Sequence, residues 1–163
     1  KNSVPNIKWV LEKARAACVR HGINGLVIDP YNEIDASRTA GKREDEHIRD
    51  MISSCKQFCR IHNIIMWVVA HPAKLMRQAD GSYPVPSMYD ISGSAHWHNM
   101  ADVGLVVHRM FDEDQVVVCT KKIREQGYYG NIGEAVFRYN IQSKSYEEVV
   151  PESPSMPVPY RDD

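Results

Sequence analysis

Apolar positions in the first half of the chain change between helical spacing and short unbroken runs. Residues 5–22 show helical spacing between a proline that suits a first turn and a glycine that suits a helix stop. Residues 25–30 are a short apolar run, typical of a buried strand. Residues 43–63 form a long amphipathic pattern that starts with acidic residues, as the helix dipole favours, and 64–71 is a second buried strand. Strand, helix and strand in this order predict a parallel crossover.

The second half of the chain has a different pattern. Residues 72–90 are a polar, proline-containing loop, and loops of that length are usually functional or disordered. A short helix at 96–102 leads to a third apolar run at 103–109, which predicts a third buried strand. The segments 114–124 and 134–141 are typical of a hairpin joined by a glycine-rich connection.

Composition limits the chain to one domain. Its 163 residues are 43% hydrophobic and 25% charged, which is ordinary globular composition. We place the domain at 1–145 and a flexible, proline-rich tail at 146–163. The chain opens at Lys1 without a methionine, so we interpret it as a piece of a longer protein.

Charge and cysteine content bear on the partners and the cellular compartment of the chain. The net charge of -1 gives no global basic field, so nucleic-acid binding would need local basic loops. The four cysteines lie mostly among apolar or helical neighbours, which favours reduced thiols and a reducing compartment, cytoplasm or organelle matrix. No apolar run approaches the roughly 20 residues of a membrane span, so we expect no membrane partner.

Two residues lie where a parallel sheet places its ligand site. Asp29 ends the first buried strand and His71 ends the second, and ligands bind beyond the C-terminal ends of such strands. An aspartate there is suited to the magnesium shell of a nucleotide, and a histidine is suited to contact a terminal phosphate. Taken alone, Asp29 is as well explained as a turn residue before Pro30, and His71 is better explained as an exposed histidine before Pro72.

A phosphate-binding loop would settle the class, but the chain has none. The one Gly-Lys pair, Gly41 and Lys42, has Ala36 at the earlier glycine position and Arg43 at the hydroxyl position. It also precedes the wrong helix. The sequence therefore contains no complete nucleotide site.

Two clusters imitate metal sites. One follows a single face of the 43–63 helix, which favours core packing over zinc: Cys55, Cys59 and His62. The other lacks any companion metal motif: His96, His98 and Asp102.

Four segments together resemble a known family. GLVIDPYNEID, WVVAHPAKL, YDISGSAHWHNMADVGLVVHR and TKKIREQGYYGNIG are similar to successive motifs of the ATPase domain of DnaB-type helicases. The resemblance is closest to the Twinkle-like and phage primase-helicase branch, and it runs from about Gly25 to Asn140. It implies an α/β fold, a RecA-like parallel sheet flanked by helices with a C-terminal antiparallel hairpin. It also implies that the phosphate-binding loop and catalytic glutamate belong upstream of Lys1.

The resemblance further implies roles for individual residues. Asp29 would act on the Mg²⁺ ion of bound ATP through water. His71 would sense the γ-phosphate, and Lys74 and Arg77 on the following loop would contact single-stranded DNA. A second DNA loop would be formed by small residues: Gly93, Ser94 and Ala95.

The resemblance also implies an assembly. Lys122 and Arg124 would project into the nucleotide site of a neighbouring subunit, with Arg124 as the arginine finger. The partners would be single-stranded DNA, further copies in a hexameric ring, and a primase, either fused or separate. Without the resemblance, we would interpret four basic residues as solvated charges: Lys74, Arg77, Lys122 and Arg124.

Two other interpretations stay open. A RecA/RadA- or KaiC-like protein would share the ATPase fold without unwinding duplex DNA. A nucleotide-free interaction module would use the truncated sheet only to assemble with partners.

Overall fold

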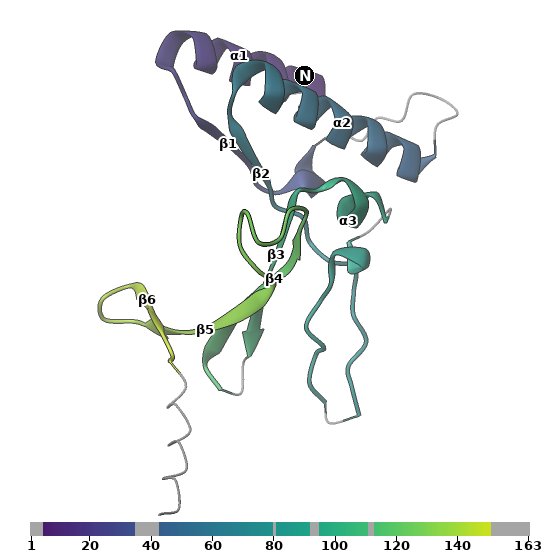
Figure 1. Ribbon diagram of the computed structural model, residues 1–163. Coiled ribbons are helices and arrows are strands. Elements are labelled where there is room, and N and C mark those ends of the chain that lie inside the picture. Colours follow the sequence, from purple (N-terminus) through teal and green to yellow (C-terminus); the bar gives the residue numbers. More distant parts are fainter. Residues whose placement is uncertain (1–4, 35–42, 80, 92–94, 111–112, 151–163) are drawn as a thin grey trace, which may run out of the picture.

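The computed structural model describes residues 5–34, 43–79, 81–91, 95–110 and 113–150. A layer of helices and a pair of parallel strands lie above an antiparallel sheet in Figure 1, and a long loop extends beside that sheet. None of the helices in the described ranges is long and apolar enough to cross a membrane.

The first half of the chain follows the predicted crossover. Helix α1 (Ile7–His21) leads to strand β1 (Gly25–Ile28), and helix α2 (Glu44–His62) leads to strand β2 (Ile65–Val68). The side chain of Asn6 accepts a hydrogen bond from the Trp9 amide at the start of α1, and Gly22 ends the helix with φ 61°. Strands β1 and β2 pair in parallel, as the pattern predicted.

Both helices pack on one face of the β1–β2 pair. Ile48, at 0% exposed, lies at the centre of a cluster formed by α2, and Met66 of β2 packs against it. Ala14 of α1 and Phe58 of α2 form a second cluster, which Met66 and Leu26 of β1 also contact. Tyr31, which follows β1, and Ala70, which follows β2, also pack against the first cluster.

The opposite face of the pair differs from the prediction of a sheet flanked by helices. Its apolar side chains are exposed: Val27 63%, Ile65 64% and Trp67 52%. Within the described ranges the parallel sheet has two strands, with helices on one face.

The antiparallel part is larger than predicted. Strand β3 (Val103–Met110) pairs with β4 (Gln115–Ile123), β4 with β5 (Gly133–Asn140), and β5 with β6 (Ser145–Glu148). The β4–β5 hairpin was predicted correctly. The prediction of β3 as a third buried strand was wrong, because β3 belongs to this sheet and its residues alternate between buried and exposed. An apolar run alone does not reveal that one of its faces is open.

Strand β6 occupies the start of the segment that we assigned to the tail. Its four residues are all exposed and pair only with β5. The proline-rich run from 151 onward lies outside the described residues.

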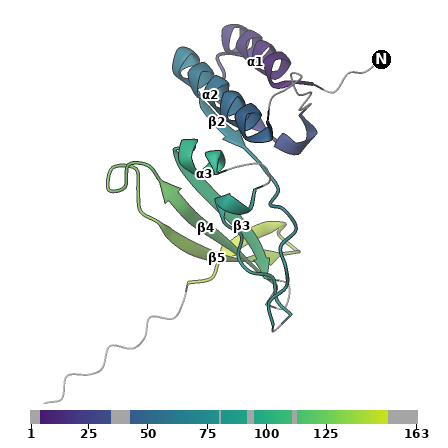
Figure 2. The ribbon, with the colours of Figure 1, turned by 90° about the vertical axis from the view of Figure 1, so that its right-hand side faces the viewer.

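The long loop between β2 and helix α3 (His96–Met100) forms an extended arm over residues 72–91. Pro72 bridges Ile91 at its base, where the Ala73 amide also donates to the Asp90 carbonyl (2.6 Å). The 3-10 helix η2 (Met88–Asp90) closes the arm. In both ribbon views the arm extends away from α1 and α2 (Figures 1 and 2).

Candidate nucleotide and DNA site

The ends of β1 and β2 are joined edge to edge. The Val69 amide donates to the Ile28 carbonyl (2.9 Å), and the Tyr31 amide donates to the Val69 carbonyl (2.7 Å). Asp29 and His71 therefore follow neighbouring strands at the same end of the sheet, and both are exposed. This is the placement that the sequence predicted for them.

The segments that carry these two residues also contact each other. The side-chain carbonyl of Asn32, in the 3-10 helix η1 (Tyr31–Glu33), accepts a hydrogen bond from the His71 amide at 3.2 Å. Sequence reasoning missed Asn32, because a side chain that binds a backbone amide 39 positions away has no local signal. The bond fixes the chain at His71 relative to the loop after Asp29.

The donor set at this end fits one side of a nucleotide site. Asp29 is an exposed carboxylate at a strand end, and magnesium is held through one or two carboxylates while it keeps several waters. Among the described residues, no group of three or more His, Cys, Asp or Glu side chains could hold a metal directly. The exposed carboxylate of Asp29 is of the kind that contacts hydrated magnesium.

Lys74 and Arg77 lie on the arm, and both are exposed. The Arg77 guanidinium lies 5.0 Å from the ring centre of Tyr83, on the returning side of the arm. A hydrogen bond with Tyr83 raises the pKa of Arg77. The Gln78 amide donates to the Ser82 carbonyl (2.9 Å) and closes the tip. The arm therefore presents its basic residues to solvent.

The predicted second DNA loop is only partly described. Gly93 and Ser94 lie outside the described residues, and Ala95 is exposed immediately before α3.

Lys122 and Arg124 contact the C-terminal end of α3. The Lys122 ammonium donates to the carbonyls of His98 and Asn99, the latter at 3.3 Å. The Arg124 Nη2 donates to the carbonyls of Asn99 and Met100, each at 3.1 Å. The last carbonyls of a helix lack partners within it, and cations there are favourable. Arg124 remains 46% exposed, so it is not part of a core.

Asp102 joins this cluster to α2. Its Oδ1 accepts from the Arg124 Nε at 2.8 Å and from the Lys56 ammonium at 2.6 Å. Partial burial acts to raise the pKa of Asp102, but hydrogen bonds and charge from Lys56 and Arg124 outweigh it and lower that pKa. The sequence placed Asp102 with His96 and His98, whereas the structure gives it two cationic partners.

Lys122 is affected by the same surroundings. Partial burial and then the charge of Arg124 lower the pKa of its ammonium group. Asp102 acts in the opposite direction. The carboxylate thus offsets the repulsion between cations gathered at the end of α3.

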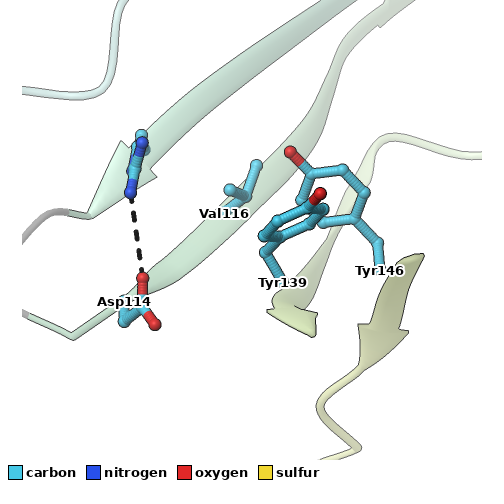
Figure 3. A pocket seen from close by; sticks show the side chains of 5 residues that line it. Asp114, Val116, Tyr139 and Tyr146 are labelled. Atoms are coloured by element: carbon cyan, nitrogen blue, oxygen red, sulfur yellow. Dashed lines mark ion pairs between the residues drawn. The ribbon is translucent and has the colours of Figure 1, made fainter. Parts of the chain in front are cut away.

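The hollows in the described part of the chain include two that are lined by charged and aromatic side chains. One, between β3, β4, β5 and β6, is lined by the Arg109–Asp114 ion pair (3.8 Å) and by Tyr139 and Tyr146, whose ring centres are 5.1 Å apart (Figure 3). Its volume of about 160 Å³ is below the roughly 300–1,000 Å³ of ordinary ligand pockets.

The second hollow lies beside the basic cluster. Its volume is about 350 Å³, and its lining includes Asp102, Arg124, Glu125 and Tyr129. We regard this hollow as the one that bears on the candidate site, because Arg124, for which the sequence predicted a role, lines it.

The cysteines are free thiols. Cys55 is buried in the α2 cluster, and burial, followed by the nearby Cys59, raises its pKa to about 12. Cys119 is also buried, at 2% exposed. Both side chains therefore act as core residues.

Comparison with known proteins places this geometry in a class. No protein-family model matches the chain. A solved structure of a DnaB-like replicative helicase, described with its interactions with primase, matches with a TM-score of 0.67 at 14% identity. The match covers 87% of this chain and 35% of the helicase chain. The fold of this chain is therefore similar to that of part of a DnaB-like replicative helicase.

Similarity in sequence narrows the class of helicase further than similarity in fold does. The Twinkle homolog protein, chloroplastic/mitochondrial, of Arabidopsis thaliana is 44% identical over 161 residues, or 96% of this chain. The chain spans 22% of that protein's length. The predicted resemblance to DnaB-type helicases, on their Twinkle branch, is thereby confirmed.

Proposed function

We propose that this chain forms part of the motor of a hexameric replicative DNA helicase, which couples ATP hydrolysis to movement along single-stranded DNA and to duplex unwinding. The observation that carries the proposal is the position of Asp29 and His71 at adjoining ends of two parallel strands. Ligands of parallel α/β sheets bind at that end.

In this proposal, Asp29 orders the magnesium ion of ATP through water, and His71 contacts the terminal phosphate. Bound ATP with Mg²⁺ supplies the phosphoryl group whose transfer releases energy. A lysine and a hydroxyl at the spacing of a phosphate-binding loop do not occur in this sequence, so Asp29 and His71 form one side of the proposed site.

The DNA contacts follow from the arm. The chain continues from His71 into Pro72, where the bridge to Ile91 starts the arm, so phosphate contact at His71 acts at its base. Lys74 and Arg77 then bind the backbone of single-stranded DNA. Gly93, Ser94 and Ala95 provide a second contact.

The assembly completes the site. Lys122 and Arg124 act on the nucleotide of the next subunit, and Arg124 stabilises charge on the transferred phosphoryl group. A primase, fused or separate, is the proposed protein partner. The name of the Arabidopsis relative favours an organelle matrix over the cytoplasm.

Substitution of Arg124 tests the proposal. Arg124→Ala in the full-length protein should lower ATP turnover by about three to five orders of magnitude, the value of an arginine finger in related enzymes. Arg138→Ala, an exposed arginine on β5, is the matched control and should leave turnover unchanged. Wild-type turnover in the Arg124 variant would refute the finger assignment.

Forked DNA separates the remaining interpretations. Strand displacement by the full-length protein supports the helicase. ATP hydrolysis without displacement would instead identify a RecA/RadA- or KaiC-like ATPase, and the absence of nucleotide binding would identify an interaction module.

A further inference from the structure

We propose that Asp102 is a positioning residue, which holds the Arg124 guanidinium in the orientation needed for its action in a neighbouring subunit. This inference rests on the proposed function of Arg124. It assigns a role to a carboxylate that lies outside the strand-end site and has two cationic partners.

The first support is the way in which Arg124 is held. Its Nε donates to Asp102 at 2.8 Å, and its Nη2 donates to three successive carbonyls at the end of α3, at 3.1, 3.1 and 3.3 Å. Its Nη1 has no hydrogen-bond partner within the described ranges. Because the guanidinium is a rigid planar fork, fixing two nitrogens also fixes the direction of the third.

The second support is that Asp102 is itself anchored. The Lys56 ammonium, on α2, contacts both Asp102 (2.6 Å) and the Met100 carbonyl (3.0 Å). The Asp102 carbonyl also accepts from the Arg124 amide at 2.8 Å. The carboxylate is therefore fixed relative to α2, the end of α3 and the end of β4.

The third support is the space around the group. Asp102 and Arg124 both line the hollow of about 350 Å³, together with Ile123, Glu125 and Tyr129. Arg124 is 46% exposed, so the fixed guanidinium remains open to a partner. Donors that are oriented before the reaction need no reorganisation during it, which is how preorganised sites lower a barrier.

The alternative is that Asp102 only stabilises the fold. A positioning role predicts loss of turnover with little change in the KM for ATP, because the ground-state contacts of ATP lie elsewhere. It also predicts that Asp102 acts only through Arg124. A structural role predicts neither result.

The test is a double-mutant cycle in the full-length protein, with DNA-stimulated ATPase activity measured at several ATP concentrations. Asp102→Asn should lower kcat by about 10- to 100-fold, the range found when a hydrogen-bonding partner that orients a metal ligand is removed. Asp102→Glu, which keeps the charge, should give an intermediate kcat. Adding Asp102→Asn to Arg124→Ala should have no further effect on kcat.

Asp114→Asn is the matched control, since it removes a carboxylate that is paired with Arg109 (3.8 Å), outside the Asp102 cluster. It should keep kcat within about twofold if positioning is the role of Asp102. Wild-type kcat in Asp102→Asn, or independent effects of Asp102→Asn and Arg124→Ala, would overturn the inference. Wild-type turnover in Arg124→Ala would instead overturn the proposed function.

Discussion

Gly104 is the position where a single methyl group should have a large effect. It lies in β3 at a bulge, where the register with β4 shifts between Gly104 and Leu105. Met88 of η2 packs over it, and a Cβ at Gly104 would lie 2.0 Å from the Met88 Sδ and 2.9 Å from its Cε. Glycine at a bulge commonly allows another segment to approach closely.

The size of the effect follows from the burial of Met88. This side chain is 7% exposed, so moving it would uncover its apolar surface or force it against other atoms. Overpacking of this kind costs about 1–3 kcal/mol. Since about 1.4 kcal/mol is a factor of ten, opening of β3 and η2 should become roughly 5- to 150-fold more frequent in Gly104→Ala.

Hydrogen exchange of the full-length protein, followed by peptide, measures this local opening. Gly133→Ala is the matched control, because a Cβ there meets nothing within 4 Å in the same sheet. When Met88 is already replaced by alanine, Gly104→Ala should cause no further loss of protection, because the side chain that it would meet is gone. The reasoning is refuted if Gly104→Ala exchanges no faster in β3 than Gly133→Ala.

Three further predictions concern charge and thiol chemistry. When log affinity for single-stranded DNA is plotted against log salt, replacing Lys74 and Arg77 by alanine should make the slope shallower by about 1.4. Lys8→Ala, on α1, should leave the slope unchanged. A slope equal to that of the wild type in the double variant would exclude the arm from DNA binding. Because the pKa of Asp102 is lowered on folding, the stability that it adds is present above about pH 3.9 and is lost as pH falls through the folded pKa. Thermal midpoints of wild type and Asp102→Asn should thus converge in acid. Cys55, with a pKa of about 12, should resist iodoacetamide at pH 8 until urea unfolds the protein, and native labelling at the unfolded rate would contradict its burial.

Local patterns predicted much of the fold. The helix stop at Gly22, the two amphipathic helices and the parallel strand pair follow from spacing and composition, whereas the cap at Asn6 was not predicted. Strand β3 was misassigned because a run of apolar residues does not reveal that Val103, Leu105 and Val107 are exposed. Strand β6 was missed because four exposed residues, SYEE, carry no burial pattern.

The candidate site was predictable only for residues whose place in the sequence, at the end of a strand, determines where they lie in the fold. Asp29 and His71 follow from strand ends, since adjacent parallel strands end together. The surroundings of Asp102 depend on Lys56, 46 positions earlier, and Arg124, 22 positions later. Such separations have no periodic signal, so only tertiary structure shows which charges meet.

The uncovered face of the β1–β2 pair has a practical consequence for work with a polypeptide limited to these residues. Val27, Ile65 and Trp67 present adjoining apolar side chains to water, on a sheet with few strands to protect its edges. Such surfaces promote self-association, which would sharpen with concentration and shift Trp67 fluorescence to shorter wavelengths. Exchanging Ile65 for threonine keeps a β-branched side chain while making this patch more polar, and is a suitable first step toward a tractable sample.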